Sequence, residues 1–339
     1  MRKIIKTIAA GIFYYGGFFH LFRLINNKFG RRLTILAYHR VTRKKVEDIQ
    51  SSLPTLFVTE ESFTRQLEFI RKHYTIMTFS DVQSYIRNGG LPRNSLIITF
   101  DDGYEDNYTN AYPLMTAMNI RSAMFLASNK IGQTDGSSYW WDRAYYYFQN
   151  HKWYIEGAHP GFDTEVQGLL QEFKDNPSKF FSRLDKKDTR ALEQLLNAIQ
   201  SAYKIQHGIL EDENKVLDWE QVRRMKNEVE FGSHTCNHYN LVALEDNLIQ
   251  DELALSAAEI KSGAGCGTEI FSYPGGNFDE RVKKAVADAG YDFAVTTQTG
   301  VNDLTDRYAL KRVSVWEGTS RGMNGKFSKS LFAFKLLGN

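Results

Sequence analysis

The sequence predicts an α/β fold, a (β/α) barrel or a doubly wound sheet, with a helical insertion. Three observations support this prediction: short apolar runs recur along the chain, amphipathic helical patterns lie between them, and one long connection interrupts the alternation. The chain has 339 residues, of which 42% are hydrophobic and 24% charged, and only six are prolines. This composition excludes a disordered or fibrous protein, and two cysteines are too few for a disulfide framework.

The expected strands are short runs rich in β-branched and aromatic residues. Most of them are nearly continuous apolar segments, which is typical of strands buried on both faces of a parallel sheet. They comprise residues 34–38, 74–79, 96–100, 123–127, 229–233, 269–273, 293–297 and 313–316.

Helical patterns separate these strands. Apolar residues from Phe63 to Tyr74 share one helical face, and Ser80 is expected to cap a helix that ends near Gly89. Residues 248–260 and 281–289 have the same amphipathic spacing. Alternating strands and helices favour a barrel or a doubly wound sheet.

The long connection, residues 128–216, is predicted to be a helical insertion. It contains an aromatic cluster at residues 139–148 and a helical pattern at residues 191–199. The insertion follows the C-terminal end of strand 123–127, and the loops at that end of a barrel form the active site. Its residues could form a wall of the substrate site or pack without contacting substrate, and the sequence leaves both interpretations open.

Two carboxylates follow the strand at residues 96–100. Asp101 and Asp102 are expected at the C-terminal edge of the sheet, where barrel active sites lie. Since Asp-Gly is also a common turn sequence, and Asp a common N-cap of a following helix, this motif alone does not establish a site.

Two histidines follow the strand at residues 229–233. The four-residue spacing of His234 and His238 is expected to place both imidazoles on one helical turn, close enough to bind a single metal ion. With a carboxylate from another strand end, they form a three-ligand site with one open position, as in catalytic metal centres.

These motifs, together with Leu36-Ala37-Tyr38-His39-Arg40-Val41 and Phe271-Ser272-Tyr273-Pro274-Gly275-Gly276, resemble the polysaccharide deacetylases, the NodB-homology group of carbohydrate esterase family 4. The resemblance covers roughly residues 33–316, with the insertion outside the matching motifs. It implies that residues 33–317 form a distorted (β/α) barrel of about seven strands, in agreement with the alternation of strands and helices. It also implies a hydrolase acting on carbon–nitrogen bonds other than peptide bonds.

The resemblance also implies roles for individual residues. Asp101 matches the catalytic base, whereas Asp102, His234 and His238 match the ligands of a divalent metal ion, expected to be zinc. The backbone N–H of Gly275 matches the donor to the oxyanion. Tyr104, Tyr273, Pro274 and Gly275 are the expected substrate-binding residues.

The sequence departs from the family pattern at two places. The usual R-x-P-Y is Ser272-Tyr273-Pro274-Gly275, so the arginine that steadies the base and a tyrosine of the groove are missing at their positions. The late L-x-H motif, which supplies the general acid, is replaced by Leu310-Lys311-Arg312. We expect His39, at the end of the first strand, to be the general acid; a structural histidine is the alternative.

The expected function is removal of an N-acetyl or other N-acyl group from an amino sugar of a polysaccharide or lipid-linked glycan. The alternatives are an O-deacetylase or a deformylase with the same site, or a non-catalytic glycan-binding protein associated with a membrane. A nucleic-acid partner is not expected, because no binding motif accompanies the basic ends of the chain.

Both ends of the chain are basic. Eleven Lys or Arg and no acid precede Glu47, and four more, again without an acid, follow Glu317. Residues 1–32 interleave these charges with apolar side chains, which favours a helix in the interface of an anionic membrane over one packed on its own domain. Residues 318–339 form the expected basic tail. A cytoplasmic protein peripheral to the inner membrane is expected; a periplasmic or cell-surface protein with an uncleaved anchor is the alternative.

Overall fold

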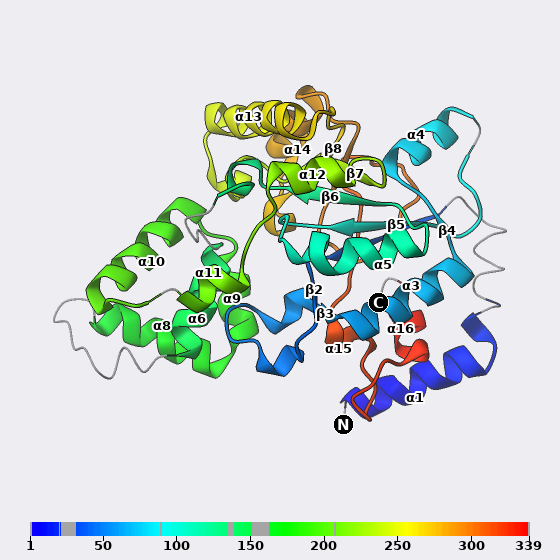
Figure 1. Cartoon of the computed structure of the whole chain (residues 1–339), viewed down its shortest axis with the longest axis horizontal. Coiled ribbons are helices and arrows are strands. Elements are labelled where there is room, and N and C mark those ends of the chain that lie inside the picture. The colour runs from blue at the N-terminus through cyan, green and yellow to red at the C-terminus, as the bar shows by residue number, and fades with distance from the viewer. Residues whose placement is uncertain are drawn as a thin grey trace.

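A parallel sheet forms the centre of the molecule (Figure 1). The computed structural model describes residues 2–19, 21, 32–88, 90–133, 139–150, 163–206 and 208–337. Seven strands follow one another in the order β10-β1-β5-β6-β7-β8-β9, and β4 pairs with β5. Because β9 and β10 end this order, the strands form a half-barrel with helices around it. The strands are β1 (Leu33–Tyr38), β4 (Thr75–Ile76), β5 (Ser95–Phe100), β6 (Ser122–Leu126), β7 (Val229–Ser233), β8 (Ile270–Ser272), β9 (Phe293–Val295) and β10 (Val313–Ser314).

Helices precede, connect and follow these strands, and five of those in the described residues belong wholly to the insertion. They are α1 (Arg2–Tyr15), α3 (Glu60–His73), α4 (Phe79–Arg87), α5 (Tyr112–Ala117), α6 (Trp140–Gln149), α8 (Asp163–Asp175), α9 (Pro177–Leu184), α10 (Thr189–Tyr203), α11 (Gly208–Glu213), α12 (Trp219–Met225), α13 (Asp246–Ala264), α14 (Glu280–Asp288), α15 (Glu317–Ser320) and α16 (Lys329–Lys335). A separate two-stranded sheet joins β2 (Arg40–Thr42) to β3 (Phe57–Thr59).

The strand register brings the functional motifs to one edge of the sheet. All six residues of β1 and of β5 are buried, and Tyr38 pairs with Phe100 at their C-terminal ends. His39 and Asp101 therefore leave the sheet side by side. At the end of β7, Ser233 pairs with Phe271 of β8, which places His234 beside Ser272.

The structure confirms most of the expected strands and helices and corrects three details. The strand expected at residues 74–79 is only the two-residue β4, and Thr78, not Ser80, caps the helix that follows it. Thr78 and Asp81 form a capping box, so Ser80 lies inside the first turn. The three-residue strands β2 and β3 were not expected, because runs this short carry no periodic signal.

The two ends of the chain lie side by side. Helix α1 packs against α16, where the rings of Phe13 and Phe334 lie 6.0 Å apart, and Figure 1 shows both helices at one end of the molecule. Within the described part of the chain, no helix has both the length and the apolar character needed to cross a bilayer. Of the N-terminal segment 1–32, residues 2–19, 21 and 32 are described.

Candidate active site

The C-terminal ends of the strands surround a pocket of about 220 Å³. His39 follows β1, Asp101 and Asp102 follow β5, and His234 and His238 follow β7. The lining also includes Tyr273 and Gly275, which follow β8. Residues spread over more than two hundred positions of sequence thus meet at the edge where parallel α/β proteins place their active sites.

Asp102, His234 and His238 form a cluster at the base of the pocket. The Asp102 Oδ1 atom lies 3.6 Å from His234 Nε2 and 3.5 Å from His238 Nε2. All three side chains are buried, and their candidate ligand atoms lie within 4.8 Å of one another. Within the described residues, this is the group of histidines and carboxylates whose geometry could hold a metal ion.

Neighbouring groups orient this cluster. The Nδ1 atom of His234 lies 2.7 Å from the carbonyl oxygen of Ser272, so Nδ1–H donates to the carbonyl and Nε2 presents its lone pair toward Asp102. Burial and the adjacent His238 lower the pKa of His234 to about 4, which keeps the imidazole neutral at physiological pH. Burial would raise the pKa of Asp102, but the hydrogen bond from His238 and the nearby histidines outweigh it and lower that pKa.

The donor set fits a divalent metal ion. Two imidazole nitrogens and one carboxylate oxygen are the ligands of many catalytic zinc centres. The neutral imidazole of His234 and the ionised carboxylate of Asp102 are in the protonation states that metal binding requires. Three protein ligands leave a coordination position for water or substrate.

The two histidines lie on an irregular loop, and the expected helical turn is wrong. Thr235 and His238 have φ values of 65° and 58°, in the left-handed region that ordinary helices exclude. Glu252 of α13 holds this loop: its Oε2 atom accepts hydrogen bonds from the backbone N–H groups of Cys236 and Asn237, at 3.0 and 2.8 Å. Sequence reasoning missed Glu252, because a glutamate in an amphipathic helix normally faces solvent.

Arg312, which directly precedes β10, binds Asp101, which follows β5. Its guanidinium binds both carboxylate oxygens of Asp101, with Nη1–Oδ1 at 2.7 Å and Nη2–Oδ2 at 2.6 Å. In the sequence, Ser272 occupies the position where the family pattern has an arginine. In the structure, Arg312 binds Asp101 in place of that arginine and also donates to the Ser272 hydroxyl at 3.1 Å. An arginine among buried residues at the start of the last strand was the available signal.

His39 lies beside the two aspartates. Its Nε2 atom is 4.0 Å from Asp101 Oδ2, and about a quarter of the side chain is exposed toward the pocket. His39 is therefore more accessible than Asp101, Asp102, His234 or His238, which are buried. Of these five side chains, His39 therefore has the most surface available for contact with a bound molecule.

The insertion lines the pocket, in the place where a wall of the substrate site is expected. Trp140, Trp141, Phe181, Ser182 and Asp185 of the insertion all contribute to the pocket wall. Asp185 lies next to Gly275, where an added Cβ atom would come within 2.3 Å of the carboxylate. The φ of Gly275 is 61°, so both the backbone conformation and the neighbouring carboxylate require glycine here.

Two of the expected substrate-binding residues do not line the pocket. Tyr104 is fully buried, and its hydroxyl donates to Asp142 of α6 at 2.8 Å. Pro274 is also buried. Tyr273 and Gly275 belong to the lining, although the Tyr273 side chain is fully buried and its hydroxyl donates to the backbone carbonyl of Tyr308 at 2.9 Å. Tyr104 follows the left-handed turn at Asp102 and Gly103 and is buried in the hydrophobic core of the insertion. Its observed contacts are structural and anchor the first helix of the insertion.

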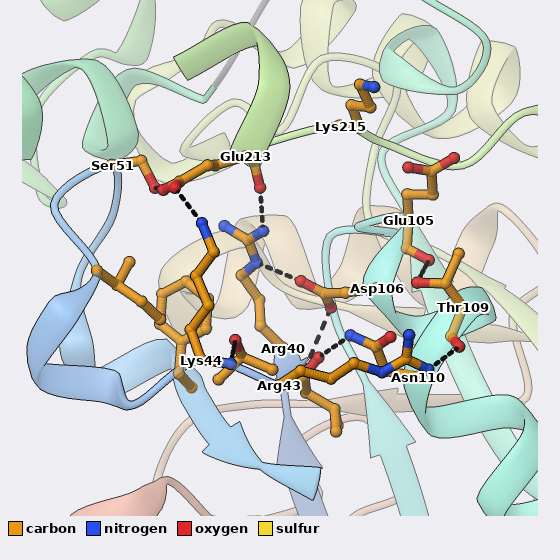
Figure 2. A pocket seen from close by; sticks show the side chains of 14 residues that line it. Arg40, Arg43, Lys44, Ser51, Glu105, Asp106, Thr109, Asn110, Glu213 and Lys215 are labelled. Carbon is orange, nitrogen blue, oxygen red and sulfur yellow. Dashed lines mark hydrogen bonds and ion pairs between the residues drawn. The ribbon is translucent and has the colours of Figure 1, made fainter. Parts of the chain in front are cut away.

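Arg40 anchors the other end of the insertion, in a second pocket of about 250 Å³ (Figure 2). The buried guanidinium donates to Asp106 at 2.7 Å, to Asn214 and to the backbone carbonyl of Glu213. Its charge also lies over the ring of Tyr104, 4.2 Å from the centroid. These contacts tie the end of the insertion to β2, and so hold the pocket wall against the barrel.

Comparisons with known sequences agree with this site. The polysaccharide deacetylase family model matches residues 88–294, a range that leaves out His39 and Arg312. YxkH of Bacillus subtilis, a protein named for the same family, is 24% identical over 303 residues, 88% of this chain and 77% of YxkH. A poly-β-1,6-N-acetyl-D-glucosamine N-deacetylase of Staphylococcus epidermidis is 32% identical over 108 residues, 30% of this chain and 37% of that protein.

Solved structures share the fold. The deacetylase PplD of Streptococcus pyogenes superposes with a TM-score of 0.55 at 16% identity, over 85% of this chain and 94% of PplD. IcaB of Ammonifex degensii gives a TM-score of 0.54 at 18% identity, over 84% of this chain and 92% of IcaB. Because the family model spans more than half of the sequence, the chain belongs to the polysaccharide deacetylase family, whose members hydrolyse carbon–nitrogen bonds other than peptide bonds.

Proposed function

We propose that this protein removes the N-acetyl group from an amino sugar of a polysaccharide or lipid-linked glycan, with a divalent metal ion as cofactor. One observation carries the proposal: an ionised, arginine-bound carboxylate, Asp101, lies directly beside the ligand set of Asp102, His234 and His238 in one pocket. The Staphylococcus epidermidis relative, which is named for N-deacetylation of an N-acetylglucosamine polymer, supports an amino sugar as substrate.

Asp102, His234 and His238 would hold the metal ion, zinc in our proposal. A divalent ion bound there supplies Lewis acidity, which polarises a carbonyl oxygen and makes water more acidic. Ser272 and Glu252 act one layer further out, by fixing the ring of His234 and the loop between the histidines.

Asp101 would accept the proton of the attacking water. Burial favours the neutral carboxyl, but Arg312 outweighs burial and holds the pKa of Asp101 well below its ordinary value, so the group stays ionised. Each carboxylate oxygen has two lone pairs, and Arg312 occupies one on each. The remaining lone pairs are free to receive a proton, while the guanidinium fixes the direction in which they point.

His39 would donate a proton to the departing amine as the C–N bond breaks. Amines are poor leaving groups without this proton, and His39 is the exposed histidine of the pocket. The backbone N–H of Gly275 would hydrogen-bond the oxyanion, and Tyr273 would border the same part of the site.

The size and lining of the pocket suit a single sugar residue. The pocket volume of about 220 Å³ lies below the ~300–1,000 Å³ of pockets that enclose drug-sized ligands. Apolar side chains of Trp140, Trp141 and Phe181 face the polar strand ends across the pocket. We therefore expect one N-acetylated residue to enter while the rest of the glycan stays outside.

The test combines metal analysis with acetate release by the full chain. Purified protein is assayed by elemental analysis, and acetate is measured from N-acetylglucosamine oligomers, O-acetylated sugars and lipid-linked sugars, with formate measured from N-formylated sugars. We expect a bound divalent ion and acetate release from the N-acetylated substrates that stops with a chelator and returns on adding zinc. Release that persists after complete metal removal would contradict the metal assignment. Release from the O-acetylated or N-formylated substrates alone would contradict N-deacetylation.

A further inference from the structure

Exposed apolar side chains are concentrated at the N-terminal end of the chain. Of the twelve large apolar side chains that are exposed in the described residues, seven lie between residues 4 and 21, and they are Ile4, Ile5, Ile8, Ile12, Tyr15, Phe18 and Leu21. Their exposed fractions run from 46% to 78%. Single exposed apolar residues are normal on a protein surface, but a contiguous group of this kind marks an interaction site.

Helix α1 has two different apolar faces. At 3.6 residues per turn, the exposed residues Ile4, Ile5, Ile8, Ile12 and Tyr15 fall within an arc of about 100°. Ala10 and Phe13 lie on the other side, where Ala10 is fully buried and Phe13 contacts Phe334. Packing on α16 therefore accounts for one face of α1, whereas the isoleucine-rich face is exposed among the described residues.

The fold brings the second basic end of the chain next to this helix. Helix α16 lies beside α1, and the segment that leads into it carries Met323, which is 62% exposed, and Lys326. Lys326 and Lys329 are both exposed. Helix α1 contains Arg2, Lys3 and Lys6 and no acidic residue, and the sequence has no acid after Glu317. Three glutamates, Glu47, Glu60 and Glu61, share a pocket with Lys326.

We propose that the exposed face of α1, with Met323, Lys326 and Lys329, docks on an anionic phospholipid membrane. We call this set of residues the α1 face. The isoleucine and tyrosine side chains of this face would enter the boundary between headgroups and acyl chains, and the lysines would meet lipid phosphates. Helix α1 has 14 residues, fewer than the ~20 that span a bilayer, so it would lie in the interface.

Charge indicates which partner covers the α1 face, a membrane or a second copy of the chain. A symmetric dimer through the α1 face would place the basic ends of both chains against each other, because a two-fold interface uses the same patch twice. An acidic lipid surface supplies the opposite charge. The apolar stripe of α1, on a helix that carries basic residues and no acidic ones, therefore favours lipid.

The structure also indicates how the test should be built. Removing the N-terminal segment would uncover Phe69 and Phe334, which pack against Tyr14 and Phe13, so a deletion would disturb the fold. Substitutions on the exposed face avoid this problem. Ile8→Ser and Ile12→Ser remove apolar area from α1, and Leu255→Ser is the matched control, because Leu255 is 52% exposed on α13, at the opposite end of Figure 1.

The experiment is co-sedimentation of the full chain with vesicles. Phosphatidylcholine vesicles are compared with vesicles that also contain phosphatidylglycerol, at low and high salt. We expect binding to the anionic vesicles only, weakened by salt. Ile8→Ser and Ile12→Ser should each lower the partition coefficient roughly tenfold or more, and Leu255→Ser should leave it unchanged.

A second pair of variants tests the charge. Lys326→Gln and Lys329→Gln should each weaken binding to anionic vesicles about fivefold, whereas Lys261→Gln on α13 should have no effect. Equal sedimentation with neutral and anionic vesicles, or none with either, would overturn the proposal. A dimer in analytical ultracentrifugation that dissociates on Ile8→Ser would identify a second copy as the occupant and would overturn it too. Thermal unfolding of each variant confirms that the fold is intact.

Discussion

Arg312 and Asp101 form a buried bidentate ion pair that joins the first residue after β5 to the residue before β10. All five N–H donors of Arg312 have acceptors: two oxygens of Asp101, the Thr99 and Ser272 hydroxyls, and the Thr296 carbonyl. A buried ion pair compensates for desolvation only when its remaining hydrogen-bonding groups are satisfied, as they are here. The pair therefore positions the proposed base and keeps it ionised.

Replacing Arg312 should destabilise the protein in a pH-dependent manner. Arg312→Met leaves the buried Asp101 carboxylate unpaired, which should cost about 3–5 kcal/mol at pH 7. In the native protein the pKa of Asp101 is lowered, so the stability contributed by the pair is present above the ordinary aspartate pKa and is lost as the pH falls through the lowered value. In the variant, burial raises this pKa, so protonation relieves the defect in mild acid.

Urea unfolding of both proteins in chelator, at several pH values, measures this effect. The difference in the free energy of unfolding should be largest near neutrality and should shrink as the pH falls. Arg281→Met is the control, because Arg281 pairs with Asp246 on the surface and should contribute less than about 1 kcal/mol. A difference that is constant over pH would show that Arg312 acts through packing alone.

Substitutions of the two adjacent aspartates should have different effects on metal binding and on turnover. Asp102→Asn changes a ligand and should weaken metal binding, whereas Asp101→Asn should retain the metal and lose roughly 10²–10⁴ in kcat. Metal content by elemental analysis and acetate release provide the two readouts. Because Asp101→Asn also leaves the Arg312 charge unpaired, thermal unfolding must accompany the assay. Equal metal loss in both variants would contradict the assignment.

Glu252 should control metal affinity without touching the ligand cluster. Its carboxylate accepts two backbone N–H groups and the Asn237 side chain, and so fixes the loop that carries His234 and His238. Glu252→Ala should lower metal affinity by about 10–100-fold, and Glu252→Gln, which keeps one oxygen acceptor, by less. Asp251→Asn, an exposed neighbour on α13, is the control. Metal titration of the three variants tests this order of affinities. An unchanged metal affinity in Glu252→Ala would show that the loop keeps its conformation without Glu252.

What the sequence predicted and what it missed have physical causes. Asp101, Asp102, His234 and His238 stand next to buried apolar strands, so their position at the strand ends follows from local pattern. Arg312 lies 211 residues from Asp101, and no local spacing connects them. The barrel register alone makes them neighbours. The loop conformation at Thr235 and His238 depends on left-handed backbone angles and on Glu252, which residue propensities do not encode.

The contribution of the insertion to the pocket could not be predicted from the sequence either. Its aromatic cluster predicted a core of its own, which the structure contains in residues such as Tyr147, Phe173 and Phe180. Trp141 nevertheless turns toward the site, where its ring lies 4.6 Å from that of His238. An aromatic residue can pack in a core or face a ligand with the same pattern, so only the structure distinguishes them.

His39 provides the test of the proposed general acid. His39→Ala should lower kcat for an N-acetylated substrate by roughly 10²–10⁴, because the amine can no longer be protonated as it leaves. An activated aryl ester, whose leaving group needs no proton, should be hydrolysed almost as fast as by the native protein. The side chain lies 4.0 Å from Asp101 and outside the Asp102, His234 and His238 cluster, so metal content should not change. Equal loss on both substrates, with metal and thermal stability unchanged, would make His39 a positioning residue.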